Sequence, residues 1–313
     1  MEITRQMPYS FEEVQSCKNI TLERVKCDYK KLREFPADTN PRKFFGNPII
    51  YQYQLKNLLN CRRGKKNYKT LKEWFDDPIL REKLWKHTIQ RNRRGQINAI
   101  PRPSDVYECH RINNGPIVPF KSSTAKFVYK RFGAKKILDP TAGWGGRMLG
   151  ATSLGIEYIG IDTNINLREG YEKMIEDLDL KNCSMIWDSC FNVDFKEINP
   201  DLVLTSPPYG NMEIYEHMNP WKSMDDFYKE FMIPLMNKLF DECDCNICIN
   251  MSPKMYKDLT SRRSPLAEAG GRGGVLWGVV PIADEMIDLR QQLGKQFKTK
   301  SQDYIYVWRP PFF

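Results

Sequence analysis

Short apolar runs, about twenty residues apart and separated by helical patterns, constrain the fold more than any other feature of this sequence. Each run is too short for a helix and is rich in β-branched and aromatic residues, which is typical of buried strands. Strands joined by helical crossovers form parallel, doubly wound α/β sheets, and we expect that fold class here. The predicted strands cover residues 137–138, 158–161, 184–187, 201–205, 246–250 and 303–308, the last of them near a sheet edge. Helices are expected over 146–154, 167–178 and 223–240.

The charge of the chain is divided unevenly between its two halves. Residues 1–136 carry 30 basic and 13 acidic side chains, whereas residues 137–313 carry 18 and 26. The sequence therefore predicts a basic, mainly helical N-terminal region (1–114), with helices over 11–32 and 71–89, followed by a catalytic domain (115–313). A basic segment interleaved with aromatic residues suits a polyanion, although a solvated helical face would look the same. The candidate nucleic-acid contacts are Arg62, Arg63, Lys65, Lys66, Arg91, Arg93 and Arg94.

Two further features of the sequence constrain where the protein is found and the state of its cysteines. The longest apolar stretch is about ten residues, too short to span a membrane, so we expect a soluble protein inside the cell, in the cytoplasm, nucleoid or nucleus. The nine cysteines indicate reduced thiols in a core and not a disulfide framework. Cys243, Cys245 and Cys248 lack a fourth ligand at a suitable spacing, and no metal site is expected.

A glycine-rich turn follows the first predicted strand, in the segment Asp-Pro-Thr-Ala-Gly-Trp-Gly of residues 139–145. Gly143 and Gly145 allow the backbone to approach a ligand closely. The turn lacks the lysine of a phosphate-binding Walker loop and the spacing of a dinucleotide fingerprint. Because Asp139 precedes the glycines and would repel a pyrophosphate, we expect a ligand that carries positive charge or hydroxyl groups.

Acidic residues also follow the second and third predicted strands. Asp162 is positioned to accept hydrogen bonds from ribose hydroxyls, and Asp188 from the exocyclic amine of an adenine. Each alone would more often be a helix cap, but three acidic strand ends around one glycine turn favour a shared ligand. An adenosine that bears a cationic group fits them all, and S-adenosylmethionine is the commonest such cofactor.

The fourth predicted strand ends in Thr-Ser-Pro-Pro-Tyr-Gly, residues 205–210. Two prolines fix the backbone and remove two amide donors, so that carbonyl groups face outward without competing donors. Ser206 adds an acceptor and Tyr209 a flat aromatic face. This set suits a planar heterocycle with an amino group, which would stack on Tyr209 and donate to Ser206 and to the carbonyl of Pro207.

Together, residues 139–145 and 205–209 resemble the signatures of the S-adenosylmethionine-dependent DNA amino-methyltransferases, which methylate N6 of adenine or N4 of cytosine. The resemblance covers roughly residues 115–313 and includes residues 119–123, which are similar to the family segment at the methionine end of the cofactor. It implies a Rossmann-like fold, a flipped target base and direct methyl transfer. The implied catalytic residues are Ser206, Pro207, Pro208 and Tyr209. The implied cofactor-binding residues are Phe120, Lys121, Ser122, Asp139, Pro140, Ala142, Gly143, Gly145, Asp162 and Asp188.

The sequence departs from the family pattern at three places. Thr141 and Trp144 replace the usual phenylalanine and small residue of the cofactor turn. Ser206 is commoner in the cytosine-N4 branch, which is therefore slightly favoured. No target-recognition domain follows the catalytic motif, and the basic N-terminal region is the expected substitute.

Other classes of methyltransferase remain alternatives, as does a catalytically dead scaffold. An RNA amino-methyltransferase uses a similar loop, and the basic region would equally suit folded RNA. A protein glutamine methyltransferase typically has asparagine where Ser206 stands. Methylation of cytosine C5 is disfavoured because no Pro-Cys dipeptide occurs. A catalytically dead nucleic-acid-binding scaffold would have no reason to retain every strand-end group.

Overall fold

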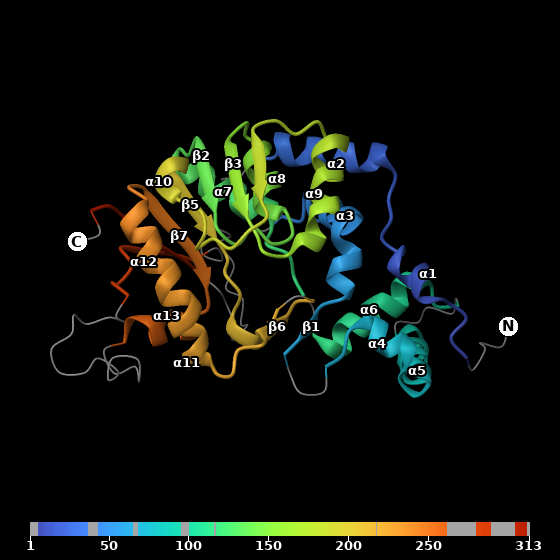
Figure 1. Cartoon of the computed structure of the whole chain (residues 1–313). Coiled ribbons are helices and arrows are strands. Elements are labelled where there is room, and N and C mark those ends of the chain that lie inside the picture. The colour runs from blue at the N-terminus through green and yellow to red at the C-terminus, as the bar shows by residue number, and fades with distance from the viewer. Residues whose placement is uncertain are drawn as a thin grey trace.

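The computed structural model describes residues 6–36, 43–64, 68–94, 100–115, 117–216, 218–261, 280–288 and 304–311. Within these ranges, the largest sheet has seven strands in the order β4-β3-β2-β5-β7-β9-β8 (Figure 1). Its strands are β2 (Lys136–Asp139), β3 (Glu157–Ile161), β4 (Cys183–Ile186), β5 (Leu202–Thr205), β7 (Asn246–Met251), β8 (Glu285–Ile287) and β9 (Tyr304–Trp308).

The predicted doubly wound, mostly parallel sheet is confirmed. β2 pairs in parallel with β3 and β5, β3 with β4, and β5 with β7, whereas β9 runs antiparallel between β7 and β8. The edge strand β8 was not predicted, and β9 lies one position inside it. Since the strand order reverses between β2 and β5, the carboxyl ends of these two strands open a crevice, where open α/β sheets bind ligands.

Helices cover both faces of the sheet because alternate strand residues point to opposite sides. Leu202 and Leu204 of β5 contribute to the core on one face, and Val203 contributes to the core on the other. The first face carries α7 (Ser122–Phe132), α8 (Gly146–Thr152) and α9 (Arg168–Asp177). The second carries α10 (Phe195–Ile198), α11 (Met224–Phe227), the π-helical turn Tyr228–Met232, α12 (Ile233–Glu242) and α13 (Pro253–Thr260).

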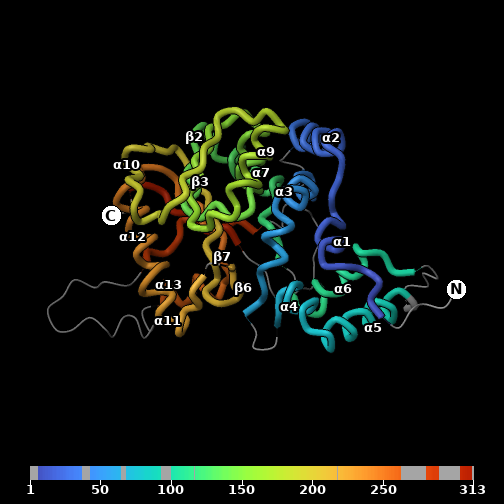
Figure 2. Tube along the Cα trace, turned by 45° about the vertical axis from the view of Figure 1, so that its right-hand side comes forward, coloured from blue at the N-terminus to red at the C-terminus, as the bar shows by residue number. Residues whose placement is uncertain are grey.

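The N-terminal region is helical, as predicted, but its helices belong to two different cores. They are α1 (Phe11–Gln15), α2 (Leu22–Glu34), α3 (Asn47–Leu59), α4 (Leu71–Asp76), α5 (Pro78–Arg94) and α6 (Pro103–Asn114). The buried residues of α2 belong to the core on the first face of the sheet, where α2 packs on other helices, whereas α1, α4, α5 and α6 enclose a separate core, which lies at the lower right of Figures 1 and 2. Helix α3 joins the two, since Ile49 and Ile50 pack in the sheet's core while Leu55 and Leu59 pack in the other.

Both long N-terminal helices that the sequence predicts are interrupted. The helix expected over 71–89 divides at Asp77, whose Oδ1 accepts from the backbone N–H groups of Ile79 and Leu80 while Pro78 begins α5. Proline is favoured at a first helical position and disfavoured inside a helix, which explains the break. The amphipathic stretch over 11–32 also forms two helices, because α1 ends at Gln15 and the hydroxyl of Thr21 caps a new helix.

A two-stranded ribbon connects the N-terminal region to the loop that follows β5. It pairs β1 (Arg62–Arg63) with β6 (Glu213–Ile214) in antiparallel register, and Arg63 lies opposite Glu213. In Figure 1 the ribbon lies between the sheet and helices α4 to α6. No helix in the described part of the chain is long and apolar enough to cross a membrane.

Candidate active site

The glycine-rich turn lies between β2 and α8, at the crevice of the sheet. Gly143 and Gly145 have φ values of +61° and +89°, a region that favours glycine. A Cβ atom on Gly143 would meet nothing closer than the carbonyl oxygen of Thr141, at 3.9 Å. The turn therefore leaves open space beside its backbone, as close approach of a ligand requires.

Asp139 lies beneath this turn, fully buried, and lines neither of the two cavities described below. Its Oδ2 accepts from Nε of Arg147 at 2.6 Å and from the hydroxyl of Tyr158 at 2.7 Å, and its Oδ1 accepts from Thr205 at 3.0 Å. The expectation that Asp139 repels anions is wrong, because the buried guanidinium of Arg147 balances its charge. Asp139 thus supports the turn from below.

The same network joins the glycine turn to the end of β5. The hydroxyls of Thr141 and Thr205 share a hydrogen bond of 2.6 Å, and Arg147 donates to the backbone carbonyl of Thr141. Thr141 occupies a position where a phenylalanine was expected from the family pattern. Its hydroxyl ties the turn to the strand that carries the catalytic motif, so the two predicted motifs form one rigid unit.

Asp162, at the end of β3, faces the turn from the other side. Its Oδ2 accepts from the backbone N–H of Gly143 at 2.7 Å, and its Oδ1 accepts from Asn164 at 2.9 Å. Burial raises the pKa of Asp162 to about 6, because desolvation outweighs these two hydrogen bonds. Each carboxylate oxygen retains a second lone pair, so Asp162 can still accept from two hydroxyls of a ligand.

A cavity of about 320 Å³ opens beside Asp162. Asp188 lies in its wall, where its Oδ1 accepts from the backbone N–H of Ser189 and from Asn192. Aromatic side chains also line it: Phe191 and Phe231 meet edge to face at 5.9 Å, and Trp221 packs beside Phe231. Flat apolar walls and carboxylates at the rim suit a nucleoside.

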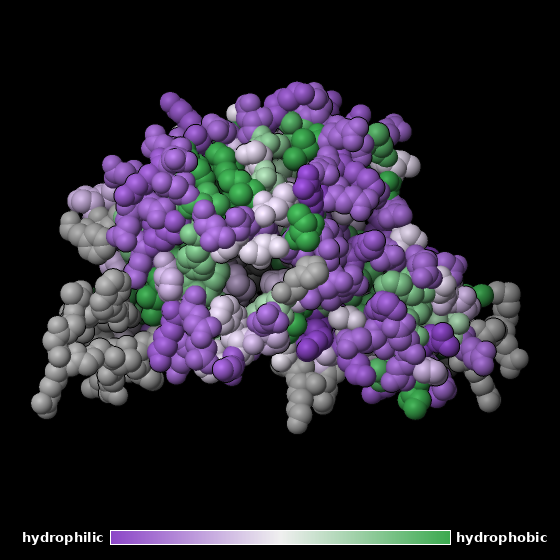
Figure 3. All heavy atoms as spheres, in the orientation of Figure 1, coloured by the Kyte–Doolittle hydropathy of each residue, from purple (hydrophilic) through white to green (hydrophobic). Residues whose placement is uncertain are grey.

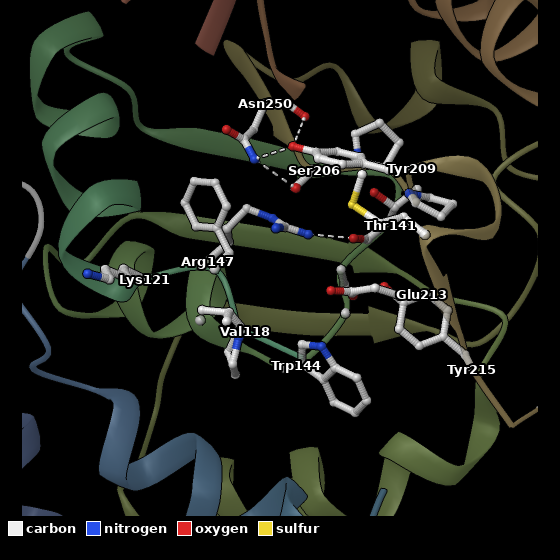
Figure 4. A pocket seen from close by; sticks show the side chains of 18 of the residues that line it. Val118, Lys121, Thr141, Trp144, Arg147, Ser206, Tyr209, Glu213, Tyr215 and Asn250 are labelled. Atoms are coloured by element: carbon white, nitrogen blue, oxygen red, sulfur yellow. Dashed lines mark hydrogen bonds between the residues drawn. The ribbon is translucent and has the colours of Figure 1, made fainter. Parts of the chain in front are cut away.

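A second cavity, of about 420 Å³, opens at the carboxyl end of β5 and is lined by the Ser-Pro-Pro-Tyr segment (Figure 4). Asn250, at the end of β7, fixes this segment: its Nδ2 donates to Ser206 Oγ at 3.1 Å and to the Tyr209 hydroxyl at 3.0 Å. The Tyr209 hydroxyl donates in turn to the backbone carbonyl of Asn250 at 3.3 Å. Asn250 thereby fixes the positions of both side chains.

The two cavities adjoin. Both are lined by Thr141, Gly143, Trp144, Ser206, Pro208 and Tyr215. A group held in the nucleoside-sized cavity and a group held against Tyr209 would therefore meet at Ser206. This adjacency permits transfer of a small group from one ligand to the other.

Most of the predicted site residues come together here. Phe120, Lys121, Ala142, Pro207 and Tyr209 line the larger cavity, and Pro140 lines the smaller one. Ser122 is fully buried in the first turn of α7 and lines neither cavity, and neither does Gly145, which caps α8.

The predicted nucleic-acid contacts are more scattered. Arg63 lines the larger cavity, whereas Arg91 is exposed on α5, in the separate helical unit. Arg62 is half-buried beside Arg63 on β1. Lys65 and Lys66 lie outside the described residues, and the side chains of Arg93 and Arg94 on α5 also lie outside them.

Three residues of the candidate site escaped the sequence analysis. Asn250 ends the fifth predicted strand, so the same strand-end rule that found Asp162 would have found it. Arg147 follows the glycine turn, in α8, but only the fold shows its pairing with Asp139. Glu213 reaches the cavity through the ribbon, for which the sequence has no local signal.

The ribbon depends on Gly64, where a side chain would collide with the loop that follows β5. A Cβ atom there would lie 1.6 Å from the carbonyl oxygen of Asn211. We expect Gly64→Ala to lower the free energy of unfolding by about 1–3 kcal/mol in a urea titration. Exchange of the amide hydrogen at position 64, which bonds to the carbonyl of Met212, should also accelerate.

Gly133→Ala is the matched control, because a Cβ atom at Gly133 meets nothing within 4 Å although its φ is +62°. The strained backbone alone should cost about 1 kcal/mol there and leave exchange at Gly64 unchanged. Equal exchange in both variants would show that the ribbon does not need a glycine.

Comparison with known proteins finds likeness in solved structures. No protein-family model and no curated sequence matches the chain. Among the solved structures, an S-adenosylmethionine-dependent methyltransferase from Neisseria gonorrhoeae aligns with 61% of this chain and 69% of its own, at 13% identity and a TM-score of 0.37. An RNA methyltransferase from Salinibacter ruber, in complex with S-adenosyl-L-homocysteine, aligns with 61% of this chain and 92% of its own, at 14% identity and a TM-score of 0.35.

Proposed function

We propose that this protein is an S-adenosylmethionine-dependent DNA methyltransferase that methylates the exocyclic amino group of a flipped base. The observation that carries the proposal is the adjacency of the two cavities at Ser206. The smaller cavity has the volume and the aromatic lining that suit a nucleoside. The larger cavity presents the hydrogen-bond acceptors and the aromatic ring that an amino heterocycle requires. The resemblance to the DNA amino-methyltransferases agrees with this geometry.

The residues of the smaller cavity fit the cofactor. Asp162 would accept from the ribose hydroxyls, and Asp188 from the adenine amine, between the aromatic side chains of Phe191 and Trp221. The open space beside Gly143 admits the methionine part toward the larger cavity. Bound S-adenosylmethionine supplies an electrophilic methyl group on a sulfonium.

The residues of the larger cavity would hold the target base. Tyr209 stacks on its ring, while Ser206 Oγ and the carbonyl of Pro207 accept its amino protons. These hydrogen bonds favour a tetrahedral nitrogen and direct its lone pair toward the smaller cavity, so that catalysis rests on position and electrostatics. The nitrogen would gain the methyl group as the methyl–sulfur bond of the sulfonium breaks, leaving a neutral thioether, and the amino group would then lose one proton.

The N-terminal region (1–114) would bind the DNA backbone and recognise the target. The amino group of a paired base lies inside the duplex, so the base must first rotate out of the stack. Hydrophilic side chains dominate the surface of the α1, α4, α5 and α6 unit in the view of Figure 3. On α5, Arg81, Lys83 and Arg91 are exposed cations, suited to phosphates.

The test is incubation with labelled S-adenosylmethionine and either unmethylated duplex DNA or total RNA, followed by mass spectrometry of the nucleosides. N4-methylcytosine or N6-methyladenine in the DNA digest, lost in the Ser206→Ala variant, is the expected result. Label only in RNA would transfer the same chemistry to another substrate. Intact cofactor binding without label in either would overturn the proposal and direct attention to a protein substrate.

Cofactor affinity should depend on the ionisation of Asp162. Only the carboxylate accepts from both ribose hydroxyls, so affinity is full well above pH 6, half of that at the folded-state pKa of about 6, and lower still as the pH drops further. We expect a decrease of about tenfold per pH unit below that value, measured by isothermal titration calorimetry between pH 5 and 8. Asp162→Asn should bind weakly throughout and lose this dependence. A wild-type affinity that is constant from pH 5 to 8 would exclude the ribose contact.

A further inference from the structure

The larger cavity contains two charged side chains that methyl transfer itself does not require. Arg63 and Glu213 line it together with the Ser-Pro-Pro-Tyr segment, and their side chains are only 26% and 21% exposed. In Figure 4 Glu213 lies across the cavity from Lys121. Partly buried charged groups that line a cavity are candidates for recognition of a polar ligand.

The ribbon fixes Arg63 relative to the stacking ring of Tyr209. The backbone N–H of Gly64 donates to the carbonyl of Met212 at 3.0 Å, and the N–H of Met212 donates to the carbonyl of Tyr209 at 3.1 Å. On the other side, the stem of Arg63 lies against Gly115, where a Cβ atom would come within 2.9 Å of Arg63 Cγ. Arg63 is therefore held from two directions.

Glu213 orients the guanidinium of Arg63 as a hydrogen-bond donor and disfavours its contact with a phosphate. Its Oε1 lies 3.5 Å from an Nη1 of Arg63, and its Oε2 accepts from the Tyr215 hydroxyl at 2.8 Å. A neighbouring carboxylate repels phosphate, but it orients a guanidinium toward a neutral acceptor. A guanidinium has five N–H donors in one plane. It can therefore keep its ion pair with Glu213 and still donate two parallel hydrogen bonds to a ligand.

Cytosine and adenine differ in the hydrogen-bond acceptors that they present to two parallel N–H donors of a guanidinium. When the amino group of cytosine faces Ser206, N3 and O2 follow it on the same edge, and both are acceptors. Adenine offers N1 beside its amino group and then a C–H, so one of the two donors would stay without a partner in a buried site.

We infer that Arg63, oriented by Glu213, binds N3 and O2 of the target base and restricts methylation to N4 of cytosine. The inference deepens the proposed function and rests on it. It assigns to the N-terminal region a residue that touches the base itself, in addition to those that contact phosphates.

Arg62 provides the matched control. It is the neighbour of Arg63 on β1, so its side chain points to the opposite face of the ribbon, and it does not line the cavity. Arg62→Gln and Arg63→Gln remove the same charge one residue apart. A loss of general attraction for DNA would affect both variants alike, whereas a loss of base recognition would affect only the second.

The experiment measures both methylated nucleosides in unmethylated genomic DNA after incubation with each full-length variant. We expect only N4-methylcytosine from the wild type and a decrease in kcat/KM of about 10- to 100-fold for Arg63→Gln that persists at low salt. For Arg62→Gln we expect a smaller loss that lies in KM, as for a phosphate contact, and that disappears at low salt. Thermal unfolding of Arg63→Gln close to that of the wild type would exclude misfolding as the cause.

Two results would overturn the inference while the methyltransferase function stands. One is N6-methyladenine as the wild-type product, and the other is an equal loss of kcat/KM in the two arginine variants. A wild type that methylates no nucleic acid would overturn the proposed function and this inference with it.

Discussion

Replacing Tyr209 by alanine is expected to lower kcat/KM for methylation by about 100-fold. The substitution removes the ring on which the target base would stack, and stacking of one base on an aromatic side chain contributes about 1–3 kcal/mol. It also removes the hydroxyl through which Asn250 fixes the loop. Initial rates with labelled S-adenosylmethionine and saturating DNA, followed by a titration of DNA, would separate the effect on kcat from that on KM.

The Tyr209→Phe variant distinguishes the two contributions. It keeps the ring and loses only the two hydrogen bonds to Asn250, so we expect a decrease of about fivefold, the low end for the loss of two neutral hydrogen bonds. If the alanine variant kept a third or more of the wild-type rate, the base could not lie against Tyr209. Equal losses in both variants would show that loop position matters and stacking does not.

The second large effect is on stability. Arg147→Met is expected to lower the free energy of unfolding by about 3–5 kcal/mol, because it leaves the carboxylate of Asp139 buried without a counter-charge. Both side chains are almost inaccessible, at 4% and 0% exposure. A urea titration followed by circular dichroism measures the change, and the melting temperature should fall by roughly 5–15 °C.

The chain contains a matched exposed pair. Nε of Arg168 lies 2.7 Å from Glu172, as Nε of Arg147 lies 2.6 Å from Asp139, but the side chains of the first pair are 56% and 61% exposed. Arg168→Met should therefore change the free energy of unfolding by less than about 1 kcal/mol. Adding Asp139→Asn to Arg147→Met should restore part of the loss. Equal effects in the two single variants would show that burial does not govern the Asp139 pair.

The sequence predicted the parts of this molecule that depend on local pattern. Strands β2, β3, β4, β5, β7 and β9 all lie where apolar runs were recognised, because a buried strand must be apolar throughout. The strand-end rule then brought Asp162, Ser206 and Tyr209 to one crevice. These residues follow directly from the parallel arrangement of the strands.

What the sequence did not predict depends on contacts between distant segments. The ribbon pairs Arg62–Arg63 with residues about 150 positions later, and a two-residue strand of arginines has no recognisable pattern. The role of Asp139 was misjudged for the same reason, since its charge can be interpreted only once Arg147 is known to lie beside it. The helix breaks at Asp77 and Thr21 have local causes, a capping side chain at each and a proline after Asp77. They were missed because the apolar spacing continues across both breaks.

Helix α3 fixes how the helical unit of α1, α4, α5 and α6 is placed relative to the sheet. Its 13 residues span about 20 Å and pack in both cores, so a rigid rod, and not a flexible tether, connects the basic helical unit to the sheet. The distance and angle between phosphates bound on α5 and a base bound at Tyr209 are then set by the length of that rod. One residue inserted into α3 would turn one unit by about 100° relative to the other. If the proposed function holds, the reach from backbone contact to extruded base would be a fixed dimension of the protein, and it would limit which nucleotide of a bound duplex can enter the cavity.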